Sequence, residues 1–333
     1  MPATLLALPA VRAPRPALPV RWRAVLVTLD DVKAAADRIR GRVLRTPLLS
    51  TVDCPLWIKP ECLQPTGAFK LRGATNAVLQ LDATVRGVVT HSSGNHAQAL
   101  AYAARAAGLP ATVVMPDDAV PAKVEATRAI GATVHLVPRA ERASAAEELA
   151  RRHGLTMIPP YDHPHVIAGQ GTVGLEIAAD APDVDVVLVP IGGGGLAAGV
   201  ATALKALRPP AAVIGVEPEL AADAADSLRR GTRTAWDPAL TARTSADGVR
   251  HAVLGELTWA HLRRHLDAVV TVTEDEIAAA VRFLAARYRV VAEPSGALST
   301  AAYLWHGEQL PAGRTVAVLS GGNGLGPVPA PAP

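Results

Sequence analysis

The chain has 333 residues, and its 33 lysine and arginine residues are nearly balanced by 30 aspartate and glutamate residues, giving a net charge of +3 at pH 7. Aromatic residues make up 3% of the chain, so the charged and stacking surface of a nucleic-acid-binding protein is not expected. Hydrophobic residues make up 50%, but no apolar run reaches the roughly 18 residues of a membrane span, so no membrane partner is expected. The length suits two hydrophobic cores or one large α/β unit.

Proline-rich segments lie at both ends of the sequence. Residues 1–27 lack the charged start and the unbroken apolar stretch of a signal peptide, so we expect a disordered segment and a cytoplasmic protein. Residues 326–333, GPVPAPAP, are expected to form a disordered tail. Cys54 and Cys62 have no metal-ligand spacing and are expected to be ordinary thiols.

Lys70 lies in the first informative motif in chain order, KPECLQPTGAFKLRGA at residues 59–74. An apolar run at 55–58 predicts a short buried strand, residues 65–67 predict a turn, and helical spacing begins at Leu71. Lys70 is therefore expected near the start of a helix, where backbone donors and the helix dipole lower the pKa of an ammonium group. Such a lysine is suited to Schiff-base chemistry with a carbonyl cofactor, and a solvated surface lysine is the alternative.

Residues 92–96, SSGNH, form the second motif. They lie between a predicted strand at 87–90 and a predicted helix at 97–107, so backbone amides at the helix N-terminus can bind an anion such as a substrate carboxylate. A serine helix cap beside an incidental histidine is the alternative.

Short β-rich runs alternate with alanine-rich helical stretches along the rest of the chain, which predicts two α/β lobes with parallel sheets. The predicted strands are residues 87–90, 111–115, 133–137, 184–191, 212–216, 269–272 and 315–319, and the predicted helices include 97–107, 122–130 and 143–152.

Four consecutive glycines, Gly192 to Gly195, follow an apolar strand and precede a helix that begins at Leu196. Free amides and the positive end of a helix then converge on one point, which is suited to a phosphate. The same stretch, with Gly199 and Glu217, also resembles a dinucleotide fingerprint. Lys70 and residues 92–96 favour the first interpretation, since a nicotinamide enzyme does not need them.

Two further turns contain candidate site residues. Residues 217–223 place Glu217, Asp223 and an intervening carbonyl within a turn, a set of oxygen ligands that suits Mg²⁺ or Ca²⁺, although acidic loops are commonly only solvated. Ser320 begins a glycine-rich turn after the strand at 315–319, which by itself is typical of an ordinary strand end.

Together the motifs resemble those of the fold type II pyridoxal phosphate enzymes, in the branch of serine/threonine dehydratases and serine racemase. The matching stretches, in order, are residues 59–74, THSSGNHAQA at 90–99, VIAGQGT at 166–172, VPIGGGGLAAG at 189–199 and LSGGNGL at 319–325. The resemblance implies a two-lobed, tryptophan synthase beta-like α/β fold. A large cofactor-binding domain would comprise 28–80 and 166–325, and a small domain 81–165, with pyridoxal 5'-phosphate between them.

The resemblance also implies a role for each site residue. Lys70 would bind the cofactor and take the α-proton, and Ser93 would be a second catalytic residue on the opposite face of Cα. The cofactor would contact Phe69, Lys70, Asn95, Gly192, Gly193, Gly194, Gly195, Leu196 and Ser320. The substrate would contact Ser92, Ser93, Asn95 and His96, and a divalent cation such as Mg²⁺ would be held by Glu217, the carbonyl of Ala221 and Asp223. Ala68 stands where many relatives have serine, so one hydroxyl near the cofactor is absent.

The resemblance implies a pyridoxal phosphate lyase that converts L-threonine or L-serine to a 2-oxo acid and ammonia, in a homodimer or homotetramer. Because Ser320 cannot hold a pyridine nitrogen protonated as a carboxylate does, elimination or reprotonation should outcompete transamination. The chain ends near the last motif, so isoleucine feedback through a regulatory extension is not expected. The alternatives are a racemase of the serine racemase type, a specialised catabolic dehydratase such as one of hydroxyectoine degradation, a nicotinamide oxidoreductase and a noncatalytic cofactor-binding protein.

Overall fold

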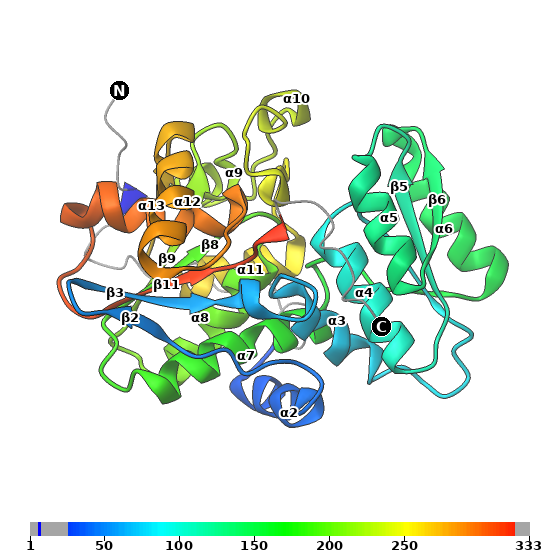
Figure 1. The fold of residues 1–333 in the computed structure, drawn as a ribbon, viewed down its shortest axis with the longest axis horizontal. Coiled ribbons are helices and arrows are strands. Elements are labelled where there is room, and N and C mark those ends of the chain that lie inside the picture. Colours follow the sequence, from blue (N-terminus) through cyan, green and yellow to red (C-terminus); the bar gives the residue numbers. More distant parts are fainter. Residues whose placement is uncertain (1–5, 8–25, 324–333) are drawn as a thin grey trace.

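Two β-sheets, each in its own lobe, organise the computed structural model of the chain, which describes residues 6–7 and 26–323 (Figure 1). The strands of the large lobe are β1 (Leu6–Ala7), β2 (Leu49–Thr51), β3 (Cys54–Pro60), β8 (Val186–Pro190), β9 (Ala212–Pro218), β10 (Ala268–Val272) and β11 (Thr315–Leu319). They form one sheet in the order β1-β10-β9-β8-β11-β3-β2. The five central strands are parallel, and the edge strands β1 and β2 are antiparallel to their neighbours.

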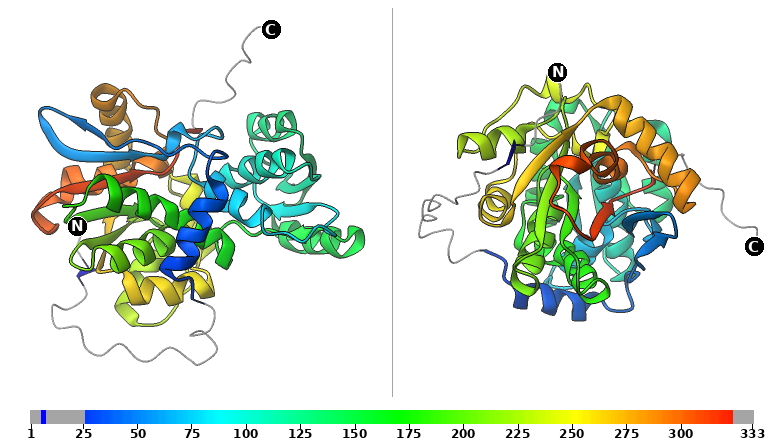
Figure 2. Two further views of the ribbon diagram at one scale, coloured as in Figure 1. Left: turned by 90° about the horizontal axis from the view of Figure 1, so that it is seen from below. Right: turned by 90° about the vertical axis from the view of Figure 1, so that its left-hand side faces the viewer.

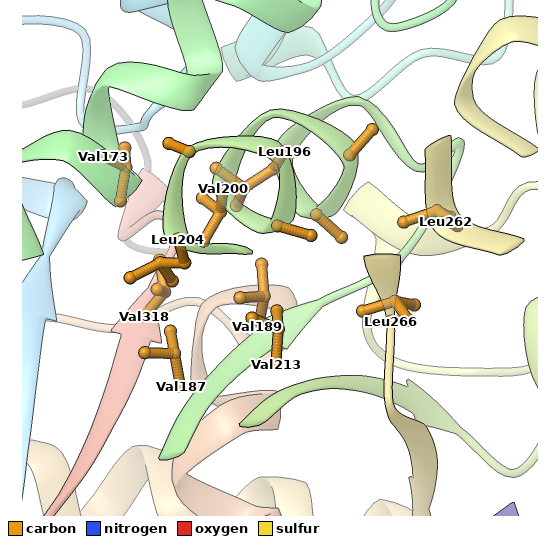
Figure 3. Packing of buried hydrophobic residues seen from close by; sticks show 14 of the residues in the cluster. Val173, Val187, Val189, Leu196, Val200, Leu204, Val213, Leu262, Leu266 and Val318 are labelled. Carbon is orange, nitrogen blue, oxygen red and sulfur yellow. The ribbon is translucent and has the colours of Figure 1, made fainter. Parts of the chain in front are cut away.

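Helices cover both faces of the large sheet because its central strands are apolar on both sides. Val187 and Val189 of β8 pack into one buried cluster and Val186 and Leu188 into another, as alternating side chains of a strand must. The first face is covered by α2 (Leu29–Ile39), α7 (Pro164–Asp180), α8 (Gly195–Leu207) and α11 (Glu256–His265), and the second by α12 (Glu274–Tyr288) and α13 (Pro294–His306). Figure 3 shows α8 packed on the strands through Leu196, Val200 and Leu204.

The small lobe is a four-stranded parallel sheet in the order β6-β5-β4-β7 and lies to one side of the large lobe (Figure 2). Its elements are β4 (Val88–His91), α4 (Asn95–Ala106), β5 (Ala111–Pro116), α5 (Pro121–Ile130), β6 (Thr133–Val137), α6 (Arg142–His153) and β7 (Thr156–Met157). Leu100 of α4 packs with Met115 on one face, and Ala146 of α6 packs with Val89 and Val114 on the other.

Helix α3 (Lys70–Val78) joins the two lobes. Its Leu71 and Ala74 lie in the same buried cluster as Leu100 of the small lobe, while Gly73 approaches Gly169 of α7 so closely that a Cβ on Gly169 would lie 2.7 Å from the Gly73 Cα. The remaining elements are the short helices α9 (Asp223–Arg230), α10 (Pro238–Thr241), η1 (Glu61–Leu63), η2 (Arg139–Glu141), η3 (Asp247–Val249) and η4 (Gly307–Gln309).

The α/β architecture with parallel sheets is confirmed, and the eight predicted strands, including the one at 55–58, all occur with ends that differ by at most two residues. The predicted small domain, 81–165, contains the whole four-stranded sheet, but its boundaries stay a prediction because α3 packs against both lobes. Within the segment expected to be disordered, Leu6–Ala7 pairs with β10, and the other residues before Leu26 lie outside the described residues, as does the tail 326–333. Among the described residues, no helix is both long and apolar enough to span a membrane.

Candidate active site

A cavity of about 400 Å³ lies between the lobes and brings the predicted cofactor and substrate residues together. It is lined by Phe69, Lys70, Ser92, Ser93, Asn95, His96, Gly192, Gly193, Gly194, Gly195, Leu196 and Ser320. The predicted metal ligands Glu217, Ala221 and Asp223 do not line it. The sequence motifs, which are far apart in the chain, thus converge where the carboxyl ends of the strands of both sheets meet.

Lys70 is the first residue of α3 and points into this cavity. Its Nζ donates a hydrogen bond to Pro160 O at 2.7 Å and lies 5.0 Å from the ring centre of Phe69. Burial lowers the pKa of Lys70 to about 8. The sequence attributed such a shift to the helix dipole, but desolvation is the cause that the structure gives. A substantial fraction of Lys70 is therefore the neutral, nucleophilic amine near physiological pH.

The loop before Lys70 is fixed by the end of β11. Phe69 N donates to Ser320 O at 3.0 Å, Gly322 N donates to Gly67 O at 2.9 Å, and Ala68 and Gly321 form an isolated antiparallel bridge. Ser320 itself is buried and its hydroxyl donates to Ser295 O at 3.4 Å. Lys70 and Ser320 therefore have a fixed relative position at the floor of the cavity.

The Ser92–His96 loop leads into α4, which begins at Asn95. Asn95 Nδ2 donates to Glu293 Oε1 at 2.6 Å, and Asn323 Nδ2 donates to Asn95 Oδ1 at 2.9 Å, so the amide is held at both ends. The Ser93 hydroxyl lines the cavity and makes no hydrogen bond with a described residue. It is free to contact a ligand.

The ring of His96 is buried and turned toward the small lobe, where its Nε2 lies 2.9 Å from Ile158 O. Burial lowers the pKa of His96 to about 3, so the ring is neutral, donates from Nε2 and has no proton on Nδ1. A neutral ring in this state cannot hold a carboxylate by charge. The role predicted for His96 in substrate binding stays a prediction, and these contacts give it no support.

The tetraglycine loop has no room for side chains. A Cβ on Gly192 would lie 2.8 Å from His251 Nδ1, one on Gly193 would lie 2.4 Å from the Tyr161 ring, and Gly194 has a φ of +92°. Helix α8 begins at Gly195, so the amides of its first turn have no acceptor within the helix. The loop is therefore a bare surface of backbone donors at a helix N-terminus, which fits a phosphate.

The sequence did not single out several residues that line the cavity, among them Tyr161, His251 and Glu293. Tyr161 and His251 meet edge to face with ring centres 4.8 Å apart. Burial raises the pKa of Glu293 to about 7, and its carboxylate accepts the hydrogen bond of Asn95. Tyr161 and His251 are 90 positions apart, so no local pattern connects them. Glu293 stands before Pro294 at the start of α13, which indicates a helix start but not a contact with Asn95.

Glu217 and Asp223 are both buried and lie near the end of β9. Glu217 accepts hydrogen bonds from Ala224 N at 3.0 Å and Ala225 N at 2.8 Å, whereas both carboxylate oxygens of Asp223 are buried without a partner. Burial raises the pKa of Asp223 to about 7, and burial together with Asp223 raises the pKa of Glu217. No group of three or more His, Cys, Asp or Glu side chains suited to a metal occurs in residues 26–323.

The family is decided by comparison with known proteins: the model of the family described as pyridoxal-phosphate dependent enzyme matches residues 39–321. The chain belongs to this family. It is 43% identical to a serine racemase of Schizosaccharomyces pombe over 309 residues, covering 90% of this chain and 95% of that protein. It is 41% identical to an L-threo-3-hydroxyaspartate ammonia-lyase of Saccharomyces cerevisiae, covering 90% and 94%. A solved structure of a threonine deaminase from T.th. superposes with a TM-score of 0.84 at 46% identity, covering 89% and 98%.

The predicted fold type II pyridoxal phosphate family is thereby confirmed, together with its dehydratase and racemase branch. The residues of the cavity fit the cofactor of this pyridoxal-phosphate dependent enzyme. Lys70 offers a partly neutral amine, and the tetraglycine loop offers backbone amides suited to a phosphate in a bend that has no space for a Cβ. The nicotinamide alternative is excluded by family membership.

Proposed function

We propose that this enzyme eliminates water from a β-hydroxy-α-amino acid and releases a 2-oxo acid and ammonia. The observation that supports this most is the lowered pKa of Lys70, about 8, in a cavity that also holds the tetraglycine and Ser92–His96 loops. Relatives named as threonine deaminase and L-threo-3-hydroxyaspartate ammonia-lyase at 41–46% identity support the same reaction class. L-threonine and L-serine are the first substrates to test.

Bound pyridoxal phosphate supplies the conjugated electron sink for the electron pair left at Cα. The residues of the chain perform the other tasks. Lys70, once its amine is free, removes the proton from Cα, and its burial keeps the amine basic but not permanently protonated. The hydroxyl on Cβ then leaves as water, and hydrolysis of the resulting enamine gives the 2-oxo acid and ammonia. The amides at the start of α4 hold the α-carboxylate.

Racemisation is the second candidate because Ser93 has a free hydroxyl in the same cavity. A proton returned to Cα from the face opposite Lys70 inverts the configuration, whereas loss of the β-hydroxyl completes the elimination. The identity of 43% to a serine racemase supports this branch of the reaction. Chiral analysis of recovered serine alongside assay of pyruvate measures the ratio of the two outcomes.

The proposal includes a divalent cation near Glu217, the Ala221 carbonyl and Asp223. The two unpartnered oxygens of Asp223 support it, because a buried carboxylate without a partner is costly and a cation would compensate its charge. The site lies outside the cavity, so the cation would be structural. We also retain the small domain at 81–165, a cytoplasmic location and a homodimer or homotetramer as parts of the proposal.

Replacement of Lys70 tests the function directly. Lys70→Ala should abolish ammonia release from L-threonine and L-serine and remove the visible absorbance of bound cofactor. Lys33→Ala is the matched control, since Lys33 is an exposed lysine on α2 whose pair with Asp30 spans 3.7 Å. If Lys70→Ala retained both turnover and absorbance, or if the wild type released no ammonia from any β-hydroxy amino acid, the proposal would be wrong.

A further inference from the structure

His251 contributes a polar atom without a partner to the lining of the cavity. It lies in the loop between η3 and α11, and its ring is half-buried. Nδ1 of the ring is buried and has no hydrogen-bond partner within residues 26–323. A buried polar atom without a partner is costly, and in native proteins a neighbouring group, a water molecule or a ligand normally satisfies it. This nitrogen therefore indicates a contact that the chain alone does not complete.

The tetraglycine loop lies against this nitrogen. A Cβ on Gly192 would lie 2.8 Å from His251 Nδ1, 3.0 Å from Val249 Cα and 3.3 Å from Gly248 O. The backbone of His251 is fixed as well, because its amide donates to Val249 O at 2.8 Å. The edge of the ring is therefore held beside the first glycine of the loop, and a ligand bound by the amides of the loop is within reach of Nδ1.

Tyr161 fixes the orientation of the His251 ring. The two rings meet edge to face, with centres 4.8 Å apart and an angle of 89° between their planes. Tyr161 also covers the next part of the loop, because a Cβ on Gly193 would lie 2.4 Å from its ring and one on Gly195 would lie 3.0 Å from its Cα. Tyr161 and His251 thus flank the tetraglycine loop together, and rotation of the imidazole would break its contact with Tyr161.

The electrostatic surroundings of His251 favour an anion. Burial lowers the pKa of His251 to about 3, and the positive charges of Lys70 and Arg142 act in the same direction. The ring is therefore neutral, and it lies where two cations and the N-terminus of α8 make the potential positive. A neutral imidazole is not repelled by these cations, and with its hydrogen on Nδ1 it can donate to an anionic oxygen.

We propose that His251 Nδ1 donates a hydrogen bond to the phosphate group of pyridoxal phosphate, so that a side chain holds the cofactor in addition to the amides of the tetraglycine loop. The oxygens of a phosphate dianion only accept hydrogen bonds, so the proton of the neutral ring would be on Nδ1 and the lone pair on Nε2. Tyr161 would then be a positioning residue for His251. His251 would have this role whichever amino acid reacts, so its test is separate from that of the proposed function.

Pyridoxal 5'-phosphate and pyridoxal form a matched pair of ligands, because they differ only in the phosphate group. The ratio of their Kd values for the apoenzyme, measured by absorbance or fluorescence titration, reports how strongly the phosphate contacts favour the phosphorylated ligand. His251→Phe should reduce this preference by about 10- to 100-fold, the effect of one hydrogen bond to a charged group. His153→Phe replaces an exposed histidine at the end of α6 and should leave the preference unchanged.

Two amide substitutions identify the nitrogen that makes the contact. The side-chain nitrogen of asparagine is bonded to Cγ, as Nδ1 of histidine is, whereas that of glutamine lies one bond further out, near the position of Nε2. We therefore expect His251→Asn to retain most of the preference for the phosphorylated ligand and His251→Gln to lose it as His251→Phe does. Because each preference is a ratio within one variant, a general loss of stability that weakens both ligands equally cancels.

Inorganic phosphate gives a second readout, which involves neither a bond to Lys70 nor turnover. It should compete with pyridoxal 5'-phosphate for the wild-type apoenzyme at a concentration at least about 10-fold lower than for His251→Phe.

The contrary outcomes are distinct. An unchanged preference in His251→Phe would overturn the inference, and so would a preference that His251→Gln retains and His251→Asn loses. If His251→Phe leaves both Kd values unchanged and raises only the KM of the amino acid, the ring contacts the substrate and the inference is wrong. In each of these cases ammonia release by the wild type, on which the proposed function depends, is unaffected.

Discussion

Arg72 and Glu61 form an ion pair that is completely buried, with Arg72 Nε donating to Glu61 Oε2 at 2.7 Å and neither side chain exposed. Arg72 also donates to Glu176 Oε1 at 2.7 Å, and Lys59 Nζ donates to Glu176 Oε2 at 2.6 Å. Because Arg72 lies two residues after Lys70 on α3, this network fixes the helix that begins at Lys70, the proposed catalytic residue.

Removal of Glu61 should therefore destabilise the protein severely. Glu61→Ala leaves a buried guanidinium short of one counter-ion, and we expect a loss of about 3–5 kcal/mol in the free energy of unfolding, measured by denaturant titration. Asp37→Ala, which removes an exposed pair with Arg40, should cost less than about 1 kcal/mol. The pKa of Glu61 is lowered in the folded state, chiefly by Arg72 against the opposing effect of burial. Its stabilisation is thus complete above its unfolded pKa of about 4.3 and is lost as the pH falls below that value.

The pKa of Lys70 predicts how the apoenzyme takes up its cofactor. Only the neutral amine attacks an aldehyde, so the rate of pyridoxal phosphate uptake should rise with pH and reach half of its maximum near pH 8. Stopped-flow absorbance measures this rate, and Lys70→Ala provides the background. A half-maximum near 10, the value for an exposed lysine, would contradict the buried environment of Lys70.

The tetraglycine loop should not tolerate alanine. A Cβ at Gly193 would lie 2.4 Å from the Tyr161 ring, so Gly193→Ala must displace either the loop or the ring. A displacement of about 1 Å can cost about 100-fold in activity, and we expect the Kd for pyridoxal phosphate to rise as well. Gly307→Ala is the control, because a Cβ there meets nothing within 4 Å. Equal cofactor affinity in the two variants would show that the loop does not hold the phosphate.

Lys123 of α5 forms an ion pair with Asp247 of η3, and this pair connects the two lobes beside the cavity. Exposed pairs contribute about 0.2–1 kcal/mol, so Lys123→Met should raise KM by about two- to fivefold, because the pair joins the two lobes that enclose the cavity. High salt should raise the KM of the wild type and leave that of the variant nearly constant. A salt response that is identical in both proteins would exclude a role for this pair in substrate binding.

The unpartnered carboxylate of Asp223 predicts that the difference in Tm between the wild type and Asp223→Asn depends on whether a divalent cation is bound. In protein treated with chelator, Asp223→Asn should raise the Tm, because it removes a buried charge that has no partner. On addition of Mg²⁺ the wild type should gain stability according to ligand concentration and the variant should not. If Mg²⁺ changes the Tm of neither protein, Ca²⁺ and Mn²⁺ are tested in the same way, and no response to any of them would refute the cation site.

The local motifs were the part of the site that could be predicted from sequence. Lys70, the Ser92–His96 loop and the tetraglycine loop each belong to a strand-turn-helix segment, and the ends of parallel strands must meet at one edge of a sheet. This rule places Lys70 and the tetraglycine loop at one edge of the large sheet, but the Ser92–His96 loop belongs to the small sheet, and only the family resemblance predicted that it lies beside them.

The residues that were missed come from packing between distant segments. His251 and Arg142 face one cavity only because the small lobe is docked on the large one, and the sequence contains no spacing that relates them. For His96 the sequence suggested a substrate contact. It could not reveal that the ring is held by the carbonyl of Ile158, a residue 62 positions further along the chain. The lowered pKa of Lys70 was expected, but its cause was not, because desolvation depends on the tertiary surroundings.

The bridge between Ala68 and Gly321 has a consequence for biosynthesis. Strand β11 lies between β8 and β3 in its sheet, yet it is the last strand in sequence among residues 26–323. A ribosome-bound chain that has not yet released β11 therefore has neither a complete large sheet nor a fixed loop before Lys70. We expect the nascent chain to acquire the vitamin B6 aldehyde only after residues 315–321 have emerged, so cofactor capture would report that the large lobe is complete.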